Sequence, residues 1–275
     1  MRRTLPHANL KMIGPWCFVD YFGPTPQTDG MVVAAHPHIG LQTVTWLLEG
    51  EIEHRDSLGS IKVIRPGQLN LMTAGYGIAH SEISNPTTER LHAVQLWLAL
   101  DEQHRNMAPA FEHHADLPMV SVGGGVAKVM IGEFAGTKSP ATYFHPMVAA
   151  ELRLSAGSHE IALNPGFEHG FLVVAGEVSM QDEVVAAADL KYLATGAGSV
   201  RVDCASDAVL LLLGGAPFGE KILMWWNFIA RNQDEITQAR AQWNTRDLRF
   251  GAEFEDRVGG WIPAPDLPNV TLQPR

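Results

Sequence analysis

The sequence predicts an all-β protein made of two related β-units, with one short helix near the C-terminus. Short segments rich in β-branched and aromatic residues recur along the 275 residues, and Gly- or Pro-containing turns separate them. This spacing is typical of β-sandwiches and β-barrels. A turn motif occurs once in each half of the chain, and only one stretch has helical periodicity.

The first half supplies the strands of one unit. Thr43–Leu48 is rich in Thr, Val and Trp and ends at Glu49-Gly50. Ile61–Ile64 precedes Arg65-Pro66-Gly67, and Leu91–Leu100 is followed by a polar stretch. Gly and Pro after a β-branched run indicate a strand end and a turn.

The second half repeats this layout. Leu47–Ile52 and Val173–Val178 share an apolar pair, one residue, Gly-Glu and an apolar residue, as expected of two related units. We therefore predict an N-terminal unit over residues 1–135 and a C-terminal unit over 136–275. Further strands are predicted at Glu151–Leu154, His159–Leu163, Gly170–Val174, Leu190–Leu193, Val200–Asp203 and Ala208–Leu213.

The helix is predicted after Asn232. Asn232 and Glu235 form a capping box, and Ile236, Ala239 and Trp243 follow at helical spacing. About three turns are expected. The later tail is rich in Gly and Pro, which favours an extended segment.

Composition limits the possible partners and setting. The formal charge is -10, so direct binding to nucleic acid, which needs a basic face, is not expected. Cys17 and Cys204 form no C-x-x-C motif, which argues against a thiolate zinc site or a disulfide framework. The N-terminus lacks the apolar stretch of a signal peptide, and the longest apolar run, Ala208–Leu213, is too short to span a membrane. We expect a cytoplasmic protein without membrane partners.

Two pairs of potential metal ligands stand out. His36 and His38 form the first pair, and His80 and Glu82 form the second. Residues two apart in a strand share a face, so each pair can direct both side chains to one point. Pro37, which cannot donate to a sheet, suits a strand edge or barrel rim. The two pairs predict a site for one metal ion.

The donor set narrows the choice of ion. Three imidazoles and one carboxylate, without thiolate, suit a divalent Fe, Mn, Co, Ni, Cu or Zn ion. Four protein ligands leave positions open for substrate on a five- or six-coordinate ion, whereas a tetrahedral zinc would be closed and structural. The sequence leaves both outcomes open.

The second unit is expected to lack this site. When the two halves are aligned on the repeated turn motif, Ala162 and Asn164 fall opposite His36 and His38. Neither side chain replaces a histidine ligand. A metal is therefore expected in the first unit alone.

Other polar residues accompany the pairs. His54 and Asp56 share a strand face and could orient ligands, form a hydrogen-bonded strand end, or supply a ligand in the case of His54. Gln42 lies on the His38 face and is expected to form hydrogen bonds near the metal. The adjacent pair His113-His114 is predicted in a surface loop. The aromatic cluster 224–228 is predicted to serve core or inter-domain packing rather than to form a binding platform.

These motifs resemble the pirin family of the cupin superfamily, and the resemblance covers nearly the whole chain. The most specific segment is the run from Met72 to Glu82. The matching segments are Gly14-Pro15, Asp20 with Phe22-Gly23-Pro24, His36-Pro37-His38-x-Gly40, Thr43-Val44-Thr45, His54-x-Asp56-Ser57-x-Gly59, Pro66-Gly67 and Met72-Thr73-Ala74-Gly75-x-Gly77-Ile78-x-His80-Ser81-Glu82.

The resemblance implies a fold and a cofactor. It implies a bicupin of two tandem jelly-roll β-barrels with a short C-terminal helix. The N-terminal barrel would hold one metal ion, first of all Fe(II), through His36, His38, His80 and Glu82, and the C-terminal barrel would be metal-free.

Two functions follow from the resemblance. Bacterial pirins are similar to quercetin 2,3-dioxygenases, in which a flavonol binds the metal through its deprotonated 3-hydroxyl and is opened by dioxygen with loss of carbon monoxide. Glu82 would then serve as ligand and as base. Other pirins are iron-dependent, redox-sensing partners of regulatory proteins. Many pirins carry Glu where this chain has Gln42, so an auxiliary carboxylate is absent.

Overall fold

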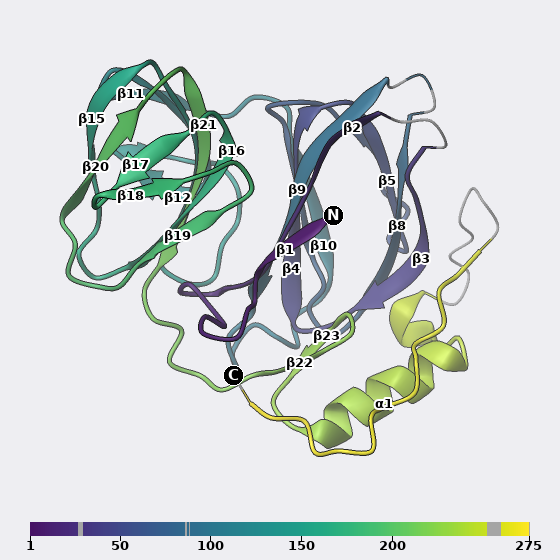
Figure 1. The fold of residues 1–275 in the computed structure, drawn as a ribbon. Helices are drawn as coiled ribbons and strands as arrows, with labels where there is room; N and C mark the ends of the chain where they lie inside the picture. Colours follow the sequence, from purple (N-terminus) through teal and green to yellow (C-terminus); the bar gives the residue numbers. More distant parts are fainter. Residues whose placement is uncertain (27–29, 86, 88, 252–259, 275) are drawn as a thin grey trace. The chain divides into compact units, whose positions relative to one another are not determined.

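The computed structural model describes residues 1–26, 30–85, 87, 89–251 and 260–274, and most of its regular structure is β-strand (Figure 1). The chain divides into two compact units, and each takes residues from two separate segments. We call Phe22–His113 with Gly219–Arg275 the histidine unit, and Met1–Tyr21 with His114–Phe218 the companion unit. This division differs from the single boundary between residues 135 and 136 that the sequence suggested.

The histidine unit contains two sheets. The first has the strand order β2-β9-β4-β7-β10, in which residues 16–21 of β2 and His114 of β10 belong to the companion unit by this division. The second has the order β3-β8-β5-β6. The bounds in the first sheet are β2 Trp16–Pro26, β9 Arg90–Ala99, β4 Leu41–Glu49, β7 Leu69–Thr73 and β10 Ala110–His114. Those in the second are β3 Val32–His38, β8 Ile78–Ser84, β5 Ile52–Asp56 and β6 Ile61–Ile64.

The companion unit has a matching pair of sheets. The first has the order β11-β12-β14-β21-β16-β19, and the second has the order β15-β20-β17-β18. The bounds in the first are β11 Met119–Val122, β12 Gly125–Phe134, β14 Met147–Leu154, β21 Ala208–Gly215, β16 Glu168–Ala175 and β19 Leu190–Leu193. Those in the second are β15 Gly157–Ala162, β20 Ser199–Cys204, β17 Val178–Met180 and β18 Glu183–Val185. Two short strands, β1 Arg2–Leu5 and β13 Thr137–Lys138, pair with β2 and β12.

The strand orders confirm the predicted internal repeat. The order β14-β21-β16-β19 reproduces β2-β9-β4-β7, and β15-β20-β17-β18 reproduces β3-β8-β5-β6. Each unit is a jelly roll of two sheets that do not close into a full barrel. In the repeat, Ala162 pairs with Ser199 where His36 pairs with His80. The corresponding position of the companion unit therefore carries no imidazole pair.

The predicted C-terminal helix is α1, Gln233–Asn244. Asn232 is its N-cap and accepts a hydrogen bond from the Glu235 amide at 3.0 Å, as the capping box predicts. Ile236, Ala239 and Trp243 are buried. A 3-10 turn, η1 Leu248–Phe250, follows the helix.

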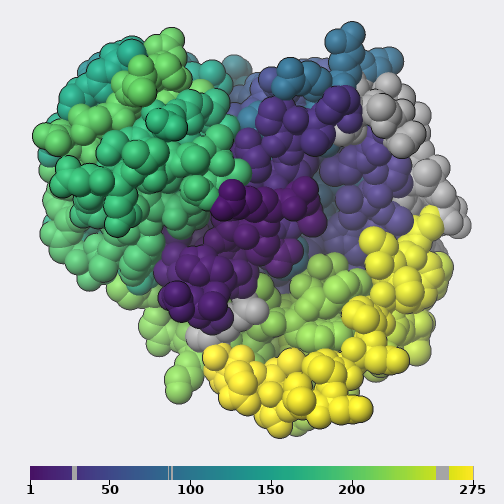
Figure 2. Space-filling view, in the orientation of Figure 1, coloured from purple at the N-terminus to yellow at the C-terminus, as the bar shows by residue number. Residues whose placement is uncertain are grey.

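The helix packs within the histidine unit. Its buried residues join Ile39 and Ala79, which come from the region of β3 and β8, in one apolar cluster. Figure 2 shows the C-terminal tail (yellow) along the outside of the helical region (light green). Residues 260–274 contain no helix or strand, as predicted, and Trp243 donates its indole N–H to the Ile262 carbonyl at 2.8 Å.

The hairpin of β22 Leu223–Trp225 and β23 Phe228–Ala230 precedes the helix. Phe228 is fully buried in the same cluster, and Trp225 and Trp226 pack against it, which confirms that the aromatic residues of 224–228 serve core packing.

The prediction of a surface loop at His113-His114 was wrong. Both residues lie in β10, and His113 Nδ1 is 2.7 Å from Asn70 Oδ1. Adjacent histidines do face opposite ways in a strand, but the half-buried edge of this sheet accommodates both. Among the described residues, no helix is both long and apolar enough to span a bilayer.

Candidate metal centre

Three of the four predicted ligands lie together between β3 and β8. These strands are antiparallel, with His36 opposite His80, and His38 follows two residues along the same strand. His38 Nε2 and His80 Nε2 are 3.1 Å apart. One ring nitrogen of each of His36, His38 and His80 lies within 4.8 Å of the others, and all three side chains are buried.

Backbone carbonyls hold two of these rings. His36 Nδ1 is 2.9 Å from the Ala34 carbonyl oxygen, and His38 Nδ1 is 3.1 Å from that of Asn227. A carbonyl only accepts, so each Nδ1 carries the proton and each Nε2 keeps its lone pair. Both rings therefore present a metal-binding nitrogen.

Sequence reasoning missed Asn227, because its contribution is a backbone carbonyl that any residue type could provide. Asn227 lies at the turn of the β22–β23 hairpin, which is fixed against β3 when Ile229 donates its amide to the Ile39 carbonyl at 3.1 Å. Gly40 permits this approach. Its φ is +69°, and a Cβ there would lie 2.2 Å from the Ile229 carbonyl oxygen.

Gly40→Ala should therefore weaken metal binding through the hairpin. The methyl group must displace Ile229, which loosens the Asn227 contact that orients His38. We expect about a 10- to 100-fold loss of metal affinity, the range for groups that orient ligands. Calorimetric metal titration measures it. Gly196→Ala is the control, because φ is also positive there but the space around it is open. Equal metal affinity in both variants would contradict this role of the hairpin.

His54 and Asp56 support the third ligand. His80 Nδ1 is 3.3 Å from His54 Nδ1, and His54 Nε2 is 3.0 Å from Asp56 Oδ2. Asp56 Oδ1 accepts the amides of Leu58 and Ser60 at 2.9 and 3.1 Å. Both nitrogens of His54 are engaged, so it is placed to orient His80 rather than to serve as a ligand.

With all three rings neutral, the buried chain Asn227–His38–His80–His54–Asp56 is one proton short. Three neutral imidazoles carry three ring protons, while the chain has four contacts. His38 must donate to a carbonyl at one end, and His54 to a carboxylate at the other. The single proton of His80 can serve only one of its two ring contacts, so the other sets two lone pairs against each other.

Protonation of His38 or His80 to supply the missing proton is unfavourable. Burial, reinforced by the neighbouring His36, holds the pKa of His38 well below its ordinary value. The pKa of His80 is lowered in the same way, first by burial and then by the neighbouring histidines. A divalent cation between the Nε2 atoms would instead accept the lone pairs and allow His80 to donate to His54. The donor set thus fits a metal ion.

Glu82 lies beside this triple but not within it. It faces His54 in the β5–β8 pairing, and its carboxylate forms a second group with His54 and His80, again within 4.8 Å. Its Oε1 accepts a hydrogen bond from Thr45 at 2.8 Å. Burial raises the pKa of Glu82, with the Thr45 hydrogen bond and His54 acting in the opposite direction.

Gln42 has a structural partner. It is fully buried, and its amide donates to the Thr73 hydroxyl at 2.8 Å. It belongs to neither group of potential ligands.

Comparison with known proteins agrees with this fold and site. The family model named Pirin matches residues 1–98, and the Pirin C-terminal cupin domain model matches residues 149–251. The chain belongs to the pirin family. A pirin-like protein of Caulobacter vibrioides is 35% identical over 274 residues, covering 96% of this chain and 93% of its own.

Two similar proteins carry an enzyme name. A Pseudomonas aeruginosa protein named "Putative quercetin 2,3-dioxygenase" is 44% identical over 269 residues, or 97% of this pirin and 85% of the relative. The crystal structure of a quercetin 2,3-dioxygenase from Acinetobacter baumannii is also 44% identical. It superposes with a TM-score of 0.94 and covers 98% of this chain and 91% of its own. This pirin therefore has the two cupin domains of its family, and a His/Glu cluster that could bind a metal ion.

Proposed function

We propose that this pirin is a metal-dependent dioxygenase that cleaves flavonols such as quercetin, with His36, His38, His80 and Glu82 as ligands of one ion. The observation that carries the proposal is the histidine chain that lacks one proton. The names of the two relatives that are 44% identical support the choice of reaction.

Fe(II) is the ion we place first. Three imidazoles and one carboxylate without thiolate suit iron, and Mn, Co, Ni, Cu and Zn are the competing occupants. When bound, such an ion supplies Lewis acidity toward a substrate hydroxyl and redox chemistry toward dioxygen.

Glu82 is our candidate base. Its burial raises its pKa, which makes the carboxylate a better proton acceptor for an acidic hydroxyl such as the flavonol 3-hydroxyl. The Thr45 hydroxyl fixes Oε1 and leaves Oε2 available for that proton. Gln95 Oε1 lies 3.1 Å from the same hydroxyl, so the single proton of Thr45 has a second, more distant acceptor.

His36 and His38 have a different role. Because backbone carbonyls accept from their Nδ1 atoms, the Nε2 atoms of both rings carry the lone pairs that a metal would bind. The edge of the Trp97 ring, 5.0 Å from the His38 ring, adds an apolar contact that limits water around that ligand. Together these contacts fix ligand orientation before substrate arrives.

An aerobic quercetin assay coupled to elemental analysis tests the proposal. Oxygen consumption and carbon monoxide release should rise in proportion to the bound metal, and chelated protein should show neither. Protein with a full equivalent of iron that leaves quercetin intact would refute the dioxygenase assignment. Such a result would favour the redox-sensing role, for which ferrous and ferric protein should bind a regulatory partner with different affinity.

A further inference from the structure

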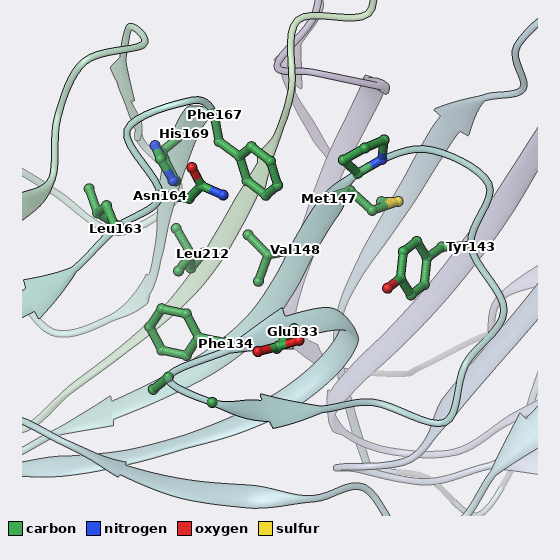
Figure 3. Close-up of a pocket in the computed structure, with 13 residues that line it drawn as sticks. Glu133, Phe134, Tyr143, Met147, Val148, Leu163, Asn164, Phe167, His169 and Leu212 are labelled. Carbon is green, nitrogen blue, oxygen red and sulfur yellow. The ribbon is translucent and has the colours of Figure 1, made fainter.

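The companion unit contains a cavity of about 350 Å³ at one end of its jelly roll (Figure 3). This volume lies within the range of about 300–1,000 Å³ typical of small-molecule sites. The core residues Phe134, Val148 and Leu212 line it, together with Leu163 and Phe167, which pack against the same core. The side of the cavity that faces the core is therefore apolar.

The internal repeat relates the cavity to the candidate metal centre of the histidine unit. Asn164, which aligns with the predicted ligand His38, lies on its rim. By the same alignment His169 on β16 matches Thr43 on β4, which lies two residues from Thr45, the residue that donates to Glu82. The companion unit thus keeps a hollow where the histidine unit holds its candidate metal centre.

Among the described residues that line the cavity, His169 has a buried polar atom without a hydrogen-bond partner. Its side chain lines the cavity and is 1% exposed, and its Nδ1 has no hydrogen-bond partner among the described residues. Burial lowers its pKa to about 4, so the ring is neutral near pH 7. Burying a polar atom without a partner destabilises the folded protein, because the atom loses its hydrogen bonds to water. A ligand that forms a hydrogen bond with the ring would offset this loss.

The lining also restricts the charge and shape of a ligand. Among the described residues of the lining, Glu133 is the only formally charged side chain, and Lys138, whose Nζ lies 6.0 Å from the centroid of the Tyr143 ring, is not part of it. Three aromatic rings, of Phe134, Tyr143 and Phe167, surround the space together with Met147 (Figure 3). These groups favour an uncharged, flat, aromatic molecule.

We propose that this cavity is a metal-free binding site for an uncharged aromatic alcohol of about two fused rings, whose hydroxyl group forms a hydrogen bond with the His169 imidazole. The site is separate from the flavonol reaction proposed above. It requires neither a metal ion nor the ligands on β3 and β8.

Titration of metal-free protein with three probes of similar shape tests this site. 2-Naphthol should bind at one site and about tenfold more tightly than naphthalene, the difference expected of one hydrogen bond. 2-Naphthoate, an anion at neutral pH, should not bind. Absence of saturable 2-naphthol binding, or equal affinity for all three probes, would overturn the proposal.

Two substitutions in the cavity lining test whether 2-naphthol binds there. His169→Phe keeps a ring but removes the hydrogen bond, so it should reduce 2-naphthol affinity about tenfold and leave naphthalene affinity unchanged. Leu163→Trp should fill the space and abolish binding of both. Should this variant fold poorly by circular dichroism, a ¹³C-methyl shift of Met147 on adding 2-naphthol to the unmodified chain reports the same occupancy.

His80→Ala distinguishes the two sites. It removes a ligand of the candidate metal centre and should leave 2-naphthol binding intact. Loss of 2-naphthol binding in this variant would place the probe at the metal centre and refute the cavity site. His169→Phe, in turn, should keep quercetin turnover. The two variants therefore show separately whether the cavity site or the proposed dioxygenase function fails.

Discussion

His80→Ala is expected to abolish stoichiometric metal binding and quercetin turnover. His80 belongs to both groups of potential ligands and connects the histidine triple to Glu82. Its removal takes away one ligand and breaks the chain to His54. We expect metal affinity to fall by more than about 100-fold, beyond the 10- to 100-fold typical of groups that only orient a ligand.

Metal content by elemental analysis and affinity by calorimetry measure this effect. His159→Ala is the matched control, because His159 is also buried but lies in the companion unit. The control should keep a full equivalent of metal. If His80→Ala retained that equivalent with unchanged affinity, the proposed ligand set would be wrong.

Asp56→Asn should weaken metal binding about 10- to 100-fold without removing a ligand. The carboxylate fixes the His54 proton on Nε2, which leaves His54 Nδ1 to accept from His80. An amide can instead donate to His54 Nε2 and move the proton to Nδ1, where it opposes the His80 N–H. Asn can still accept the amides of Leu58 and Ser60, so the turn is preserved.

Two readouts separate this effect from simple loss of folding. The iron reduction potential should shift along with the metal affinity, because the basicity of His80 changes, while thermal unfolding of the metal-free protein should change little. Glu53→Gln is the control on the same strand, since Glu53 forms an ion pair with Arg55 and, as the neighbour of His54 in β5, lies on the opposite face of the strand. If Asp56→Asn left the metal affinity and the iron reduction potential unchanged, His54 would orient His80 without Asp56.

The positions of the strands and the helix could be predicted from local sequence, because turn residues and helix caps act on their immediate neighbours in the chain. Ile61–Ile64 and Leu190–Leu193 lie between turn residues and became strands with the predicted bounds. Asn232 satisfies a free helix amide, a requirement of every helix start. The repeated Gly-Glu motif indicated the two units correctly, because each unit must build the same turn.

Long-range pairing explains what the sequence did not predict. The spacing of His36 and His38 placed them on one face, but only the pairing of β3 with β8 brings His80 opposite them. The role of His54 depends on its position opposite Glu82 in the next strand. Asn227 acts through its backbone, which leaves no trace in residue type, so nothing in the sequence marked it.

The hairpin that supplies the Asn227 carbonyl also sets an order of events during synthesis. The three histidines leave the ribosome early, whereas the group that orients His38 is made near the end of the chain. A nascent chain that has reached residue 218 holds every ligand candidate but lacks the carbonyl that selects the correct nitrogen of His38. A chain truncated before the hairpin should therefore bind its metal with a His38 ring that the Asn227 carbonyl does not orient.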